Sequence, residues 1–219
     1  ASMLREALQI EVPVLVGNDA DLGALGEATF GVRADDMVYV SGEVGVGGSV
    51  ISGGVRLSGR AGLAGEFGHM LVNPAGPRCS CGAIGCWETE IGERALLRRA
   101  GLDSDGGVPA VDELFTRAGA GDSAALDALE AEGRWLGMGI AGLINAFDPD
   151  VVVLGALLER VLPYVRDSLD AALAERKIHG LERSVDVVGA TFGNDATLLG
   201  AAELAFGPLL ADPAGVASA

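Results

Sequence analysis

A cluster of metal-binding residue types between positions 69 and 86 constrains this chain most. His69 is followed by Cys79, Cys81 and Cys86, which are all the cysteines of the chain. Three thiolates and one imidazole are the ligands of a tetrahedral Cys3His zinc site, whereas an odd, tightly spaced set of cysteines is a poor disulfide framework. Because the protein would fill all four positions, we expect a structural zinc ion, not a catalytic one. The alternative, three buried thiols beside an unrelated histidine, is disfavoured because this loop has little apolar material for a core.

The overall composition excludes several classes of protein. The 219 residues carry 31 acidic and 15 basic side chains, which gives a formal net charge of -16. A chain this acidic repels a phosphate backbone and is not by itself a nucleic-acid-binding module. A hydrophobic fraction of 49% excludes disorder, and the chain has no run of about 18 apolar residues that could span a membrane. The first residues lack a secretory signal pattern, so with the clustered cysteines we expect a cytoplasmic location.

The hydrophobic pattern predicts an α/β fold. Strands are expected at 12–16, 37–41, 49–51, 55–57, 151–154 and 185–188. Helices are expected from about 19, around 111–118, at 123–147, at 158–176 and from 194 or 195 to 206. The stretch 37–57 is typical of an antiparallel pair or triple with a turn at Gly42–Gly48, and the glycines of the helix 123–147 indicate close packing against it. The tail 210–219 is expected to fray.

Two further patterns are only weak indications of a site. Asn18 and Asp19 follow the first expected strand, where a carboxylate can accept a proton from a substrate hydroxyl. An Asx turn that caps the next helix explains the same pair, and spacing alone favours the cap. The hairpin residues Gly42, Glu43, Gly45, Gly47 and Gly48 could present backbone N–H groups to a phosphate, but they fit neither the P-loop nor the dinucleotide fingerprint.

Two carboxylates lie at the ends of the cysteine loop. Glu66 is three residues before His69, and Glu88 is two residues after Cys86. A metal that fixes His69 and Cys86 also fixes these carboxylates. Together with Asn18 and Asp19 they would form a site rich in hydrogen-bonding groups, as a sugar requires, although each glutamate alone is equally typical of a solvated surface.

The stretches Gly65–His69 and Cys79–Glu88 closely resemble the signature of the ROK family, whose name stands for repressors, open reading frames and sugar kinases. Similar segments run through nearly the whole chain, at 13–19, 39–54, 145–155 and 193–202. The resemblance implies the actin-like ATPase, or ribonuclease H-like, fold. It also implies that residues 1–209 are the C-terminal lobe with the zinc loop 65–88 inserted, and that the N-terminal lobe and a helix-turn-helix are absent from this chain.

The resemblance assigns roles to individual residues. Asp19 is similar to the base that deprotonates the sugar in kinases of the family, and Asn18, Glu66, His69 and Glu88 are similar to its sugar contacts. His69 would then use one ring nitrogen for zinc and the other for the sugar. Gly155 and Ala156 correspond to the adenosine side of the site.

Two departures from the kinase pattern separate the possible functions. Glu43 stands where the kinases have a threonine in Gly-Thr-Gly-x-Gly, and two negative charges about 4 Å apart repel by ~4 kcal/mol at an effective dielectric of 20. Ala156 replaces a second glycine after Gly155. We therefore expect the sugar-sensing effector domain of a ROK transcriptional regulator. It would bind a monosaccharide or derivative, form a homodimer, and contact DNA only through a domain outside this chain.

Two alternatives remain open. One is an ATP-dependent, glucokinase-like sugar kinase that uses Mg²⁺, in which Glu43 lies away from the transferred phosphate or binds the metal ion. The other is a zinc-stapled domain without a small-molecule site. The sequence does not identify the sugar.

Overall fold

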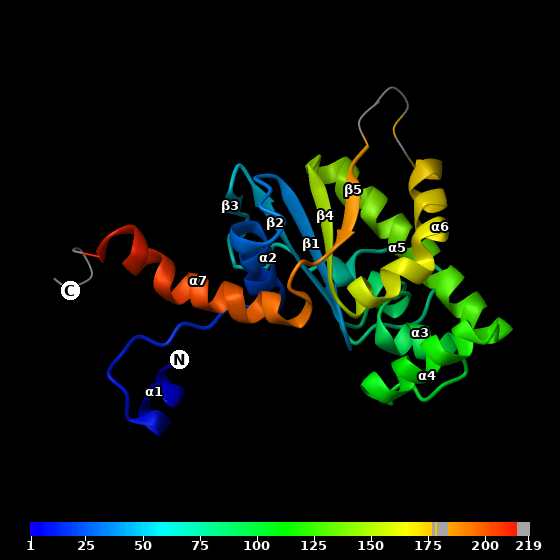
Figure 1. Ribbon diagram of the computed structural model, residues 1–219, viewed down its shortest axis with the longest axis horizontal. Coiled ribbons are helices and arrows are strands. Elements are labelled where there is room, and N and C mark those ends of the chain that lie inside the picture. The colour runs from blue at the N-terminus through cyan, green and yellow to red at the C-terminus, as the bar shows by residue number, and fades with distance from the viewer. Residues whose placement is uncertain (177, 179–183, 214–219) are drawn as a thin grey trace.

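The computed structural model describes residues 1–176, 178 and 184–213. These residues form a five-stranded mixed sheet in the order β3-β2-β1-β4-β5 (Figure 1). Its strands are β1 (Met37–Gly42), β2 (Val46–Ser52), β3 (Val55–Arg56), β4 (Val151–Ala156) and β5 (Asp186–Gly189). β2 pairs antiparallel with β1 and β3, whereas β4 pairs parallel with β1 and β5. The antiparallel pair or triple predicted for 37–57 is therefore confirmed as a triple, and the two later strands are also present.

Helices cover both faces of this sheet. The helices of the described residues are α1 (Ser2–Leu8), α2 (Asp19–Phe30), α3 (Glu93–Arg99), α4 (Gly107–Gly119), α5 (Ser123–Phe147), α6 (Leu157–Arg176) and α7 (Ala196–Ala211). The described part of the chain also forms three short 3-10 turns, η1 (Phe67–His69), η2 (Trp87–Thr89) and η3 (Gly193–Asp195). The pair α2 and α7 lies on one face, and α5 and α6 lie on the other, with α3 and α4 packed outside α5.

Strand β1 shows why the sheet needs cover on both faces. Met37 and Tyr39 pack in the cluster beneath α2, whereas Val38 and Val40 belong to the larger core beneath α5 and α6. All four are at most 2% exposed. A continuous apolar run of this kind is typical of a strand buried on both faces, and each such side chain contributes about 1.5–3 kcal/mol by leaving water.

The glycines of α5 allow the close packing that the sequence predicts, and the partner is this same chain. A Cβ on Gly133 would lie 2.0 Å from Ser168 Oγ, and one on Gly137 would lie 2.7 Å from the carbonyl oxygen of Leu169. Both contacts are with α6, so any side chain at these two positions would separate the helices.

Three features differ from the sequence prediction. Residues 12–16 are not a strand: they join no strand of the described sheet, and their apolar side chains are largely exposed. The apolar run around Pro13 has the local pattern of a strand, but no neighbouring strand of the described sheet pairs with it. The turn between β1 and β2 is shorter than Gly42–Gly48, because the ladder continues until Gly42 faces Val46. Helix α1 was not predicted, and it buries none of its residues.

The ends of the chain extend from the body of the molecule. Helix α7 continues to Ala211 and so includes the first residues of the expected tail, while 214–219 lie outside the described residues.

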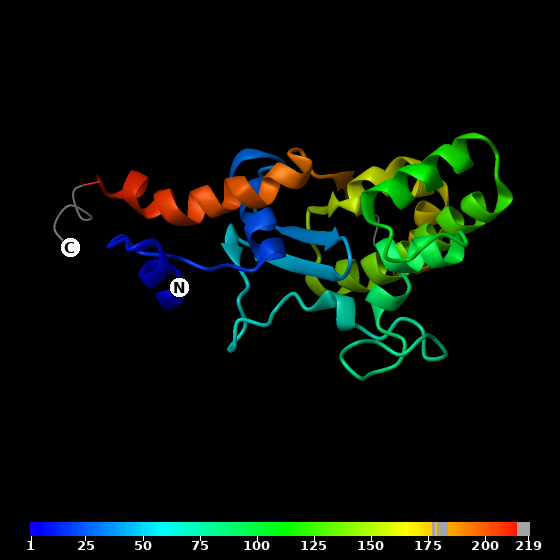
Figure 2. The same cartoon turned by 90° about the horizontal axis from the view of Figure 1, so that it is seen from below.

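Figure 2 shows the segment of 57–88 (cyan to teal) leaving the sheet as a long irregular loop. Within the described residues no helix is long and apolar enough to cross a membrane.

Candidate functional site

A cavity of about 610 Å³ lies where the start of α2, the β1–β2 hairpin, the turns η1 and η2 and the start of α7 meet. Residues predicted for the site that line this cavity are Asn18, Asp19, Glu43, Gly45, Gly47, Glu66, His69, Glu88 and Ala156. The structure thus brings together residues that are distant in the sequence. Gly42, Gly48 and Gly155 are not among the lining residues, and neither are the cysteines.

Asn18 and Asp19 form the N-terminal end of α2. Asn18 is the N-cap, and its Oδ1 accepts hydrogen bonds from the backbone N–H groups of Ala20 at 2.9 Å and Asp21 at 3.3 Å. Asp19 Oδ1 accepts from the same Ala20 N–H at 2.8 Å. The capping role that spacing favours is therefore present, and the capped end also faces the cavity. Asp21 has a different role, because it pairs with Arg56 at 2.8 Å.

The turn η1 carries Glu66 and His69 to the cavity because glycines let it lie against β2. A Cβ on Gly68 would lie 2.2 Å from the carbonyl oxygen of Val46, and the Phe67 ring occupies the space that a side chain at Gly48 would need. The two glycines of Gly65–His69 and the glycine inside β2 therefore form one close contact. A larger residue at any of them would push the turn away from the cavity.

The four residues of the predicted metal site converge behind this turn. One ligand atom from each of His69, Cys79, Cys81 and Cys86 lies within 4.8 Å of the others. Cys79 Sγ is 3.6 Å from His69 Nδ1, and Cys81 Sγ is 3.6 Å from Cys86 Sγ. Zinc–ligand bonds of ~2.0–2.3 Å at tetrahedral angles place ligand atoms ~3.5–3.8 Å apart. The cluster could therefore hold a metal ion.

A metal ion binds cysteines as negatively charged thiolates, but two of the three cysteines favour the protonated form in the absence of an ion. Burial raises the pKa of the Cys86 thiol to about 12, and it also raises the pKa of Cys79, which donates to Glu88 Oε1 at 2.8 Å. The backbone N–H of Ala83 lowers the pKa of Cys81. Because thiolates are the ligating form, a bound cation would displace these protons.

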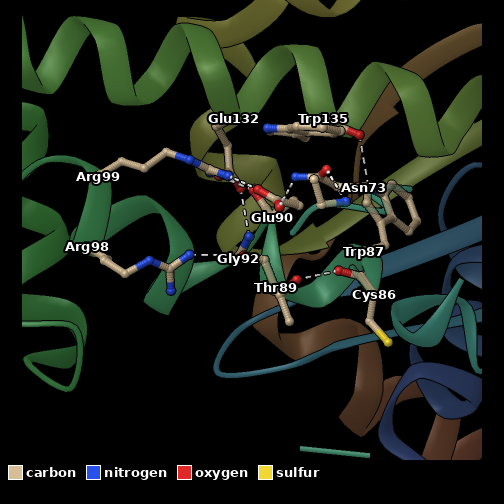
Figure 3. Close-up of polar contacts among 11 residues, drawn as sticks. Asn73, Cys86, Trp87, Thr89, Glu90, Gly92, Arg98, Arg99, Glu132 and Trp135 are labelled. Carbon is tan, nitrogen blue, oxygen red and sulfur yellow. Dashed lines mark hydrogen bonds and ion pairs between the residues drawn. The ribbon is translucent and has the colours of Figure 1, made fainter. Parts of the chain in front are cut away.

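A buried network fastens the cysteine loop to α3 and α5 (Figure 3). The Trp87 indole N–H donates to the Trp135 carbonyl at 2.9 Å, and a Cβ on Gly139 would lie 2.1 Å from the Trp87 ring. On the other strand of the loop, the Asn73 amide donates to Glu90 Oε1 at 2.6 Å. The loop is thus linked to α5 through Trp87, and to α3 through Glu90, which pairs with Arg99 at 2.5 Å.

Glu132 of α5 lies at the centre of this network. It is 0% exposed, and its Oε1 accepts the Gly92 N–H at 2.7 Å. The Arg99 guanidinium lies 3.5 Å from Glu132 but 2.5 Å from Glu90. Burial raises the pKa of Glu132 to about 8, although the Gly92 N–H and Arg99 act in the opposite direction. Sequence reasoning missed this residue, yet it stands on the buried stripe of α5 beside Gly133, where a carboxylate is unusual.

Further lining residues were not predicted either. Tyr39 lies on β1, with its hydroxyl against Gly155, and burial raises its pKa to about 12. Thr197 at the start of α7 donates its hydroxyl to the Asp19 carbonyl at 3.3 Å. Ser41 and Asn194 also line the cavity. Of these residues, Asn194 alone was singled out in the sequence, and only as a possible start of the last helix.

The two departures from the kinase pattern both lie on this cavity. Glu43 is an exposed residue of the β1–β2 turn. Ala156 ends β4 with φ +55°, in the left-handed region that favours glycine. The backbone conformation at this position therefore explains why the family pattern has glycine there, where this chain has Ala156.

Comparison with known proteins places these features in one family. The family model described as "ROK family" matches residues 3–207. The xylose repressor of Bacillus subtilis (strain 168) is 33% identical over 191 residues, which are 86% of this chain and 49% of the repressor. This chain therefore spans about half the length of that relative.

Two solved structures share the fold. One is the crystal structure of a ROK family glucokinase from Streptomyces griseus in complex with glucose and AMPPNP. It has a TM-score of 0.79 and 35% identity over 90% of this chain and 70% of that chain. The other is a ROK family transcriptional regulator, a homologue of the E. coli MLC protein. It has a TM-score of 0.77 and 29% identity over 92% of this chain and 53% of that chain. The predicted actin-like ATPase fold is thereby confirmed, and the chain belongs to the ROK family.

Proposed function

We propose that this chain is the sugar-sensing effector lobe of a ROK-family transcriptional regulator. The observation that carries the proposal is the composition of the 610 Å³ cavity. It gathers an amide, an imidazole and carboxylates that can bind sugar hydroxyls, and it also contains Glu43 at the hairpin where a kinase must receive phosphates. Binding of the sugar would stabilise one arrangement of the lobe relative to the rest of the regulator, in proportion to the difference in affinity between the two states.

The proposed sugar contacts are Asn18, Asp19, Glu66, His69 and Glu88. Carboxylates accept hydrogen bonds from hydroxyl groups, and such charge-assisted bonds are stronger than neutral ones. His69 can act on both sides, because its Nδ1 is 3.6 Å from Cys79 Sγ while its Nε2 is 4.0 Å from Glu66 Oε2. A metal on Nδ1 would leave the proton on Nε2, where it can be donated to a hydroxyl.

We assign a structural zinc ion to His69, Cys79, Cys81 and Cys86. The chemistry of the donors and their mutual distances support zinc, and the four ligands leave no open position for catalysis. The long loop 57–88 contains few regular elements, so the ion would supply the constraint that packing does not. Through His69 it would also fix the neighbouring Glu66, and through Cys79 and Cys86 it would fix Glu88.

The second candidate function is an ATP-dependent sugar kinase. Its support is the structural similarity to the S. griseus glucokinase, which was crystallised with glucose and AMPPNP, together with Asp19 at the cavity as a candidate base. In that case Glu43 would have to contact Mg²⁺ or remain away from the transferred phosphate. The phosphate-type residues Gly42, Gly45, Gly47 and Gly48, and the adenosine-side residues Gly155 and Ala156, would then approach the nucleotide.

One experiment separates the two candidates. The protein is titrated calorimetrically with glucose, xylose and N-acetylglucosamine, and the same sugars are then incubated with ATP and Mg²⁺ while ADP release is measured. The regulator proposal expects binding of at least one sugar and no sugar-dependent ADP release. Turnover at ~1 s⁻¹ or faster, the range of ordinary kinases, would refute it. Absence of binding by every sugar would instead favour a domain with no small-molecule site.

The assembly follows from the same proposal. A regulator of this type would work as a homodimer in the cytoplasm and reach DNA through a separate domain, because the -16 charge of this chain opposes direct contact with phosphates. Mass photometry of the purified chain would test the dimer.

A further inference from the structure

We propose that the cavity selects saccharides that carry no anionic group and rejects their phosphorylated or carboxylated derivatives. This inference rests on the proposed sugar binding and names the chemical class of the ligand. It separates a free sugar from a sugar phosphate, two signals that differ only by a charged substituent.

The charges on the cavity wall all have the same sign. The ionisable carboxylates that line it are Asp19, Glu43, Glu66 and Glu88, and the described lining residues include no lysine or arginine. Arg56 is the basic side chain that reaches toward α2, and it is already engaged by Asp21 at 2.8 Å. A phosphate in this cavity would meet four carboxylates, with no lysine or arginine among the described lining residues to bind it.

Backbone N–H groups at the helix N-termini could attract an anion despite these carboxylates, but several of them already bond to oxygens of this chain. The N-terminus of a helix attracts anions through its unpaired N–H groups. At α2, Asn18 and Asp19 occupy the N–H groups of Ala20 and Asp21 with their own oxygens. Asp19 also places a full negative charge at that end of the helix, where an anionic ligand would otherwise bind.

The start of α7 is occupied in the same way. The turn η3 precedes it, and the Asp195 N–H donates to the Phe192 carbonyl while the Ala196 N–H donates to the Gly193 carbonyl. Asp195 adds a carboxylate at this helix end. The N–H groups of Ala20 and Asp21 in α2, and those of Asp195 and Ala196 at α7, are therefore already bonded within the chain and face no anion.

The proposed metal does not reverse the sign. A divalent ion bound by three thiolates and one neutral imidazole leaves a net charge of about -1 on the group, so it adds no positive field to the cavity. The His69 ring that faces the cavity would remain neutral while it ligates the ion. The proposed rejection of anionic sugars therefore holds with or without the metal ion in place.

The test compares sugars that differ only in charge. Calorimetric titrations use glucose against glucose 6-phosphate, and N-acetylglucosamine against N-acetylglucosamine 6-phosphate, at ~0.01 M and ~1 M NaCl. We expect each phosphate to bind at least tenfold more weakly than its parent sugar at low salt. The ratio should shrink at high salt, because the Debye length falls from about 30 Å to about 3 Å.

Two variants make the cause specific. Glu43→Gln removes one wall carboxylate and should reduce the ratio of the two affinities several-fold. Glu130→Gln removes an equal charge from an exposed position on α5 outside the cavity lining and should leave the ratio unchanged. A phosphate that binds as tightly as its parent sugar, or a ratio that Glu43→Gln leaves unaltered, would overturn the inference while leaving sugar binding intact. If neither parent sugar binds, the proposed function itself fails.

Discussion

Replacement of Glu132 by glutamine should change how the stability of the protein depends on pH. Glu132 is fully buried, with its carboxylate between the Gly92 N–H and the Arg99 guanidinium. The Arg99 guanidinium lies 2.5 Å from Glu90 but 3.5 Å from Glu132, so it stabilises the charge of Glu90 more strongly than that of Glu132. Burial therefore dominates at Glu132 and raises its pKa from 4.5 to about 8.

The magnitude follows from proton linkage. The folded state holds the proton of Glu132 between pH 4.5 and about 8, whereas the unfolded chain releases it. The stabilising contribution is thus fully present below pH 4.5 and is lost as the pH rises through the folded pKa. The slope is ~1.4 kcal/mol per pH unit, which amounts to about 4 kcal/mol between pH 5 and pH 8. A neutral glutamine keeps an acceptor for the Gly92 N–H and has no such dependence.

The assay is urea unfolding followed by the fluorescence of Trp87 and Trp135, at intervals from pH 5 to pH 8. We expect Glu132→Gln to match the unaltered protein within ~1 kcal/mol at pH 5 and to exceed it in stability by several kcal/mol at pH 8. Glu130→Gln, on the exposed side of the same helix, should change neither value by more than ~0.5 kcal/mol. A stability difference that stays constant across this range, or that comes to favour Glu132 as the pH rises, would show instead that Arg99 keeps the carboxylate of Glu132 ionised.

Three further substitutions test other parts of the structure. Cys81→Ser should release the bound metal and expose 69–88 to proteolysis; elemental analysis that still finds one zinc ion per chain would contradict the assigned ligands. Ala156→Gly should stabilise the protein by ~1 kcal/mol in urea unfolding, because glycine relieves a left-handed conformation that costs ~1–2 kcal/mol, less an entropy cost of ~0.5–1 kcal/mol; a loss of stability would contradict this. Gly139→Ala places a methyl group where the Trp87 ring lies and should destabilise the protein by ~1–3 kcal/mol with a changed tryptophan spectrum, whereas an unaltered spectrum would argue against this contact.

The features predictable from sequence were those encoded by short-range patterns. The Cys-x-Cys-x4-Cys spacing identified the cluster that could hold a metal ion, and the apolar runs identified β1, β4 and their neighbours. The glycines of α5 indicated close packing, although only the structure shows that α6 and the Trp87 ring are the partners. Residues 12–16 had the strand pattern but are unpaired, because pairing depends on a neighbouring strand that a local pattern cannot reveal.

The remaining parts of the site depend on long-range packing. Tyr39 and Thr197 reach the cavity from β1 and α7, and no local motif connects them with Asp19. Glu132 interacts with Gly92 only because α5 lies across the end of the cysteine loop. The positive φ of Ala156 is likewise a tertiary property that its sequence neighbours do not specify.

We propose that a zinc ion holds the loop so that Glu66, His69 and Glu88 face a sugar in the cavity. The most direct measurement is the affinity of one monosaccharide from the panel, titrated by calorimetry into protein loaded with zinc, stripped by chelator, and reloaded. We expect binding to the loaded protein, a loss of ~10–100-fold in affinity on stripping, and recovery on reloading. Equal affinity for the loaded and stripped protein would contradict it, because the sugar site would then not depend on the metal.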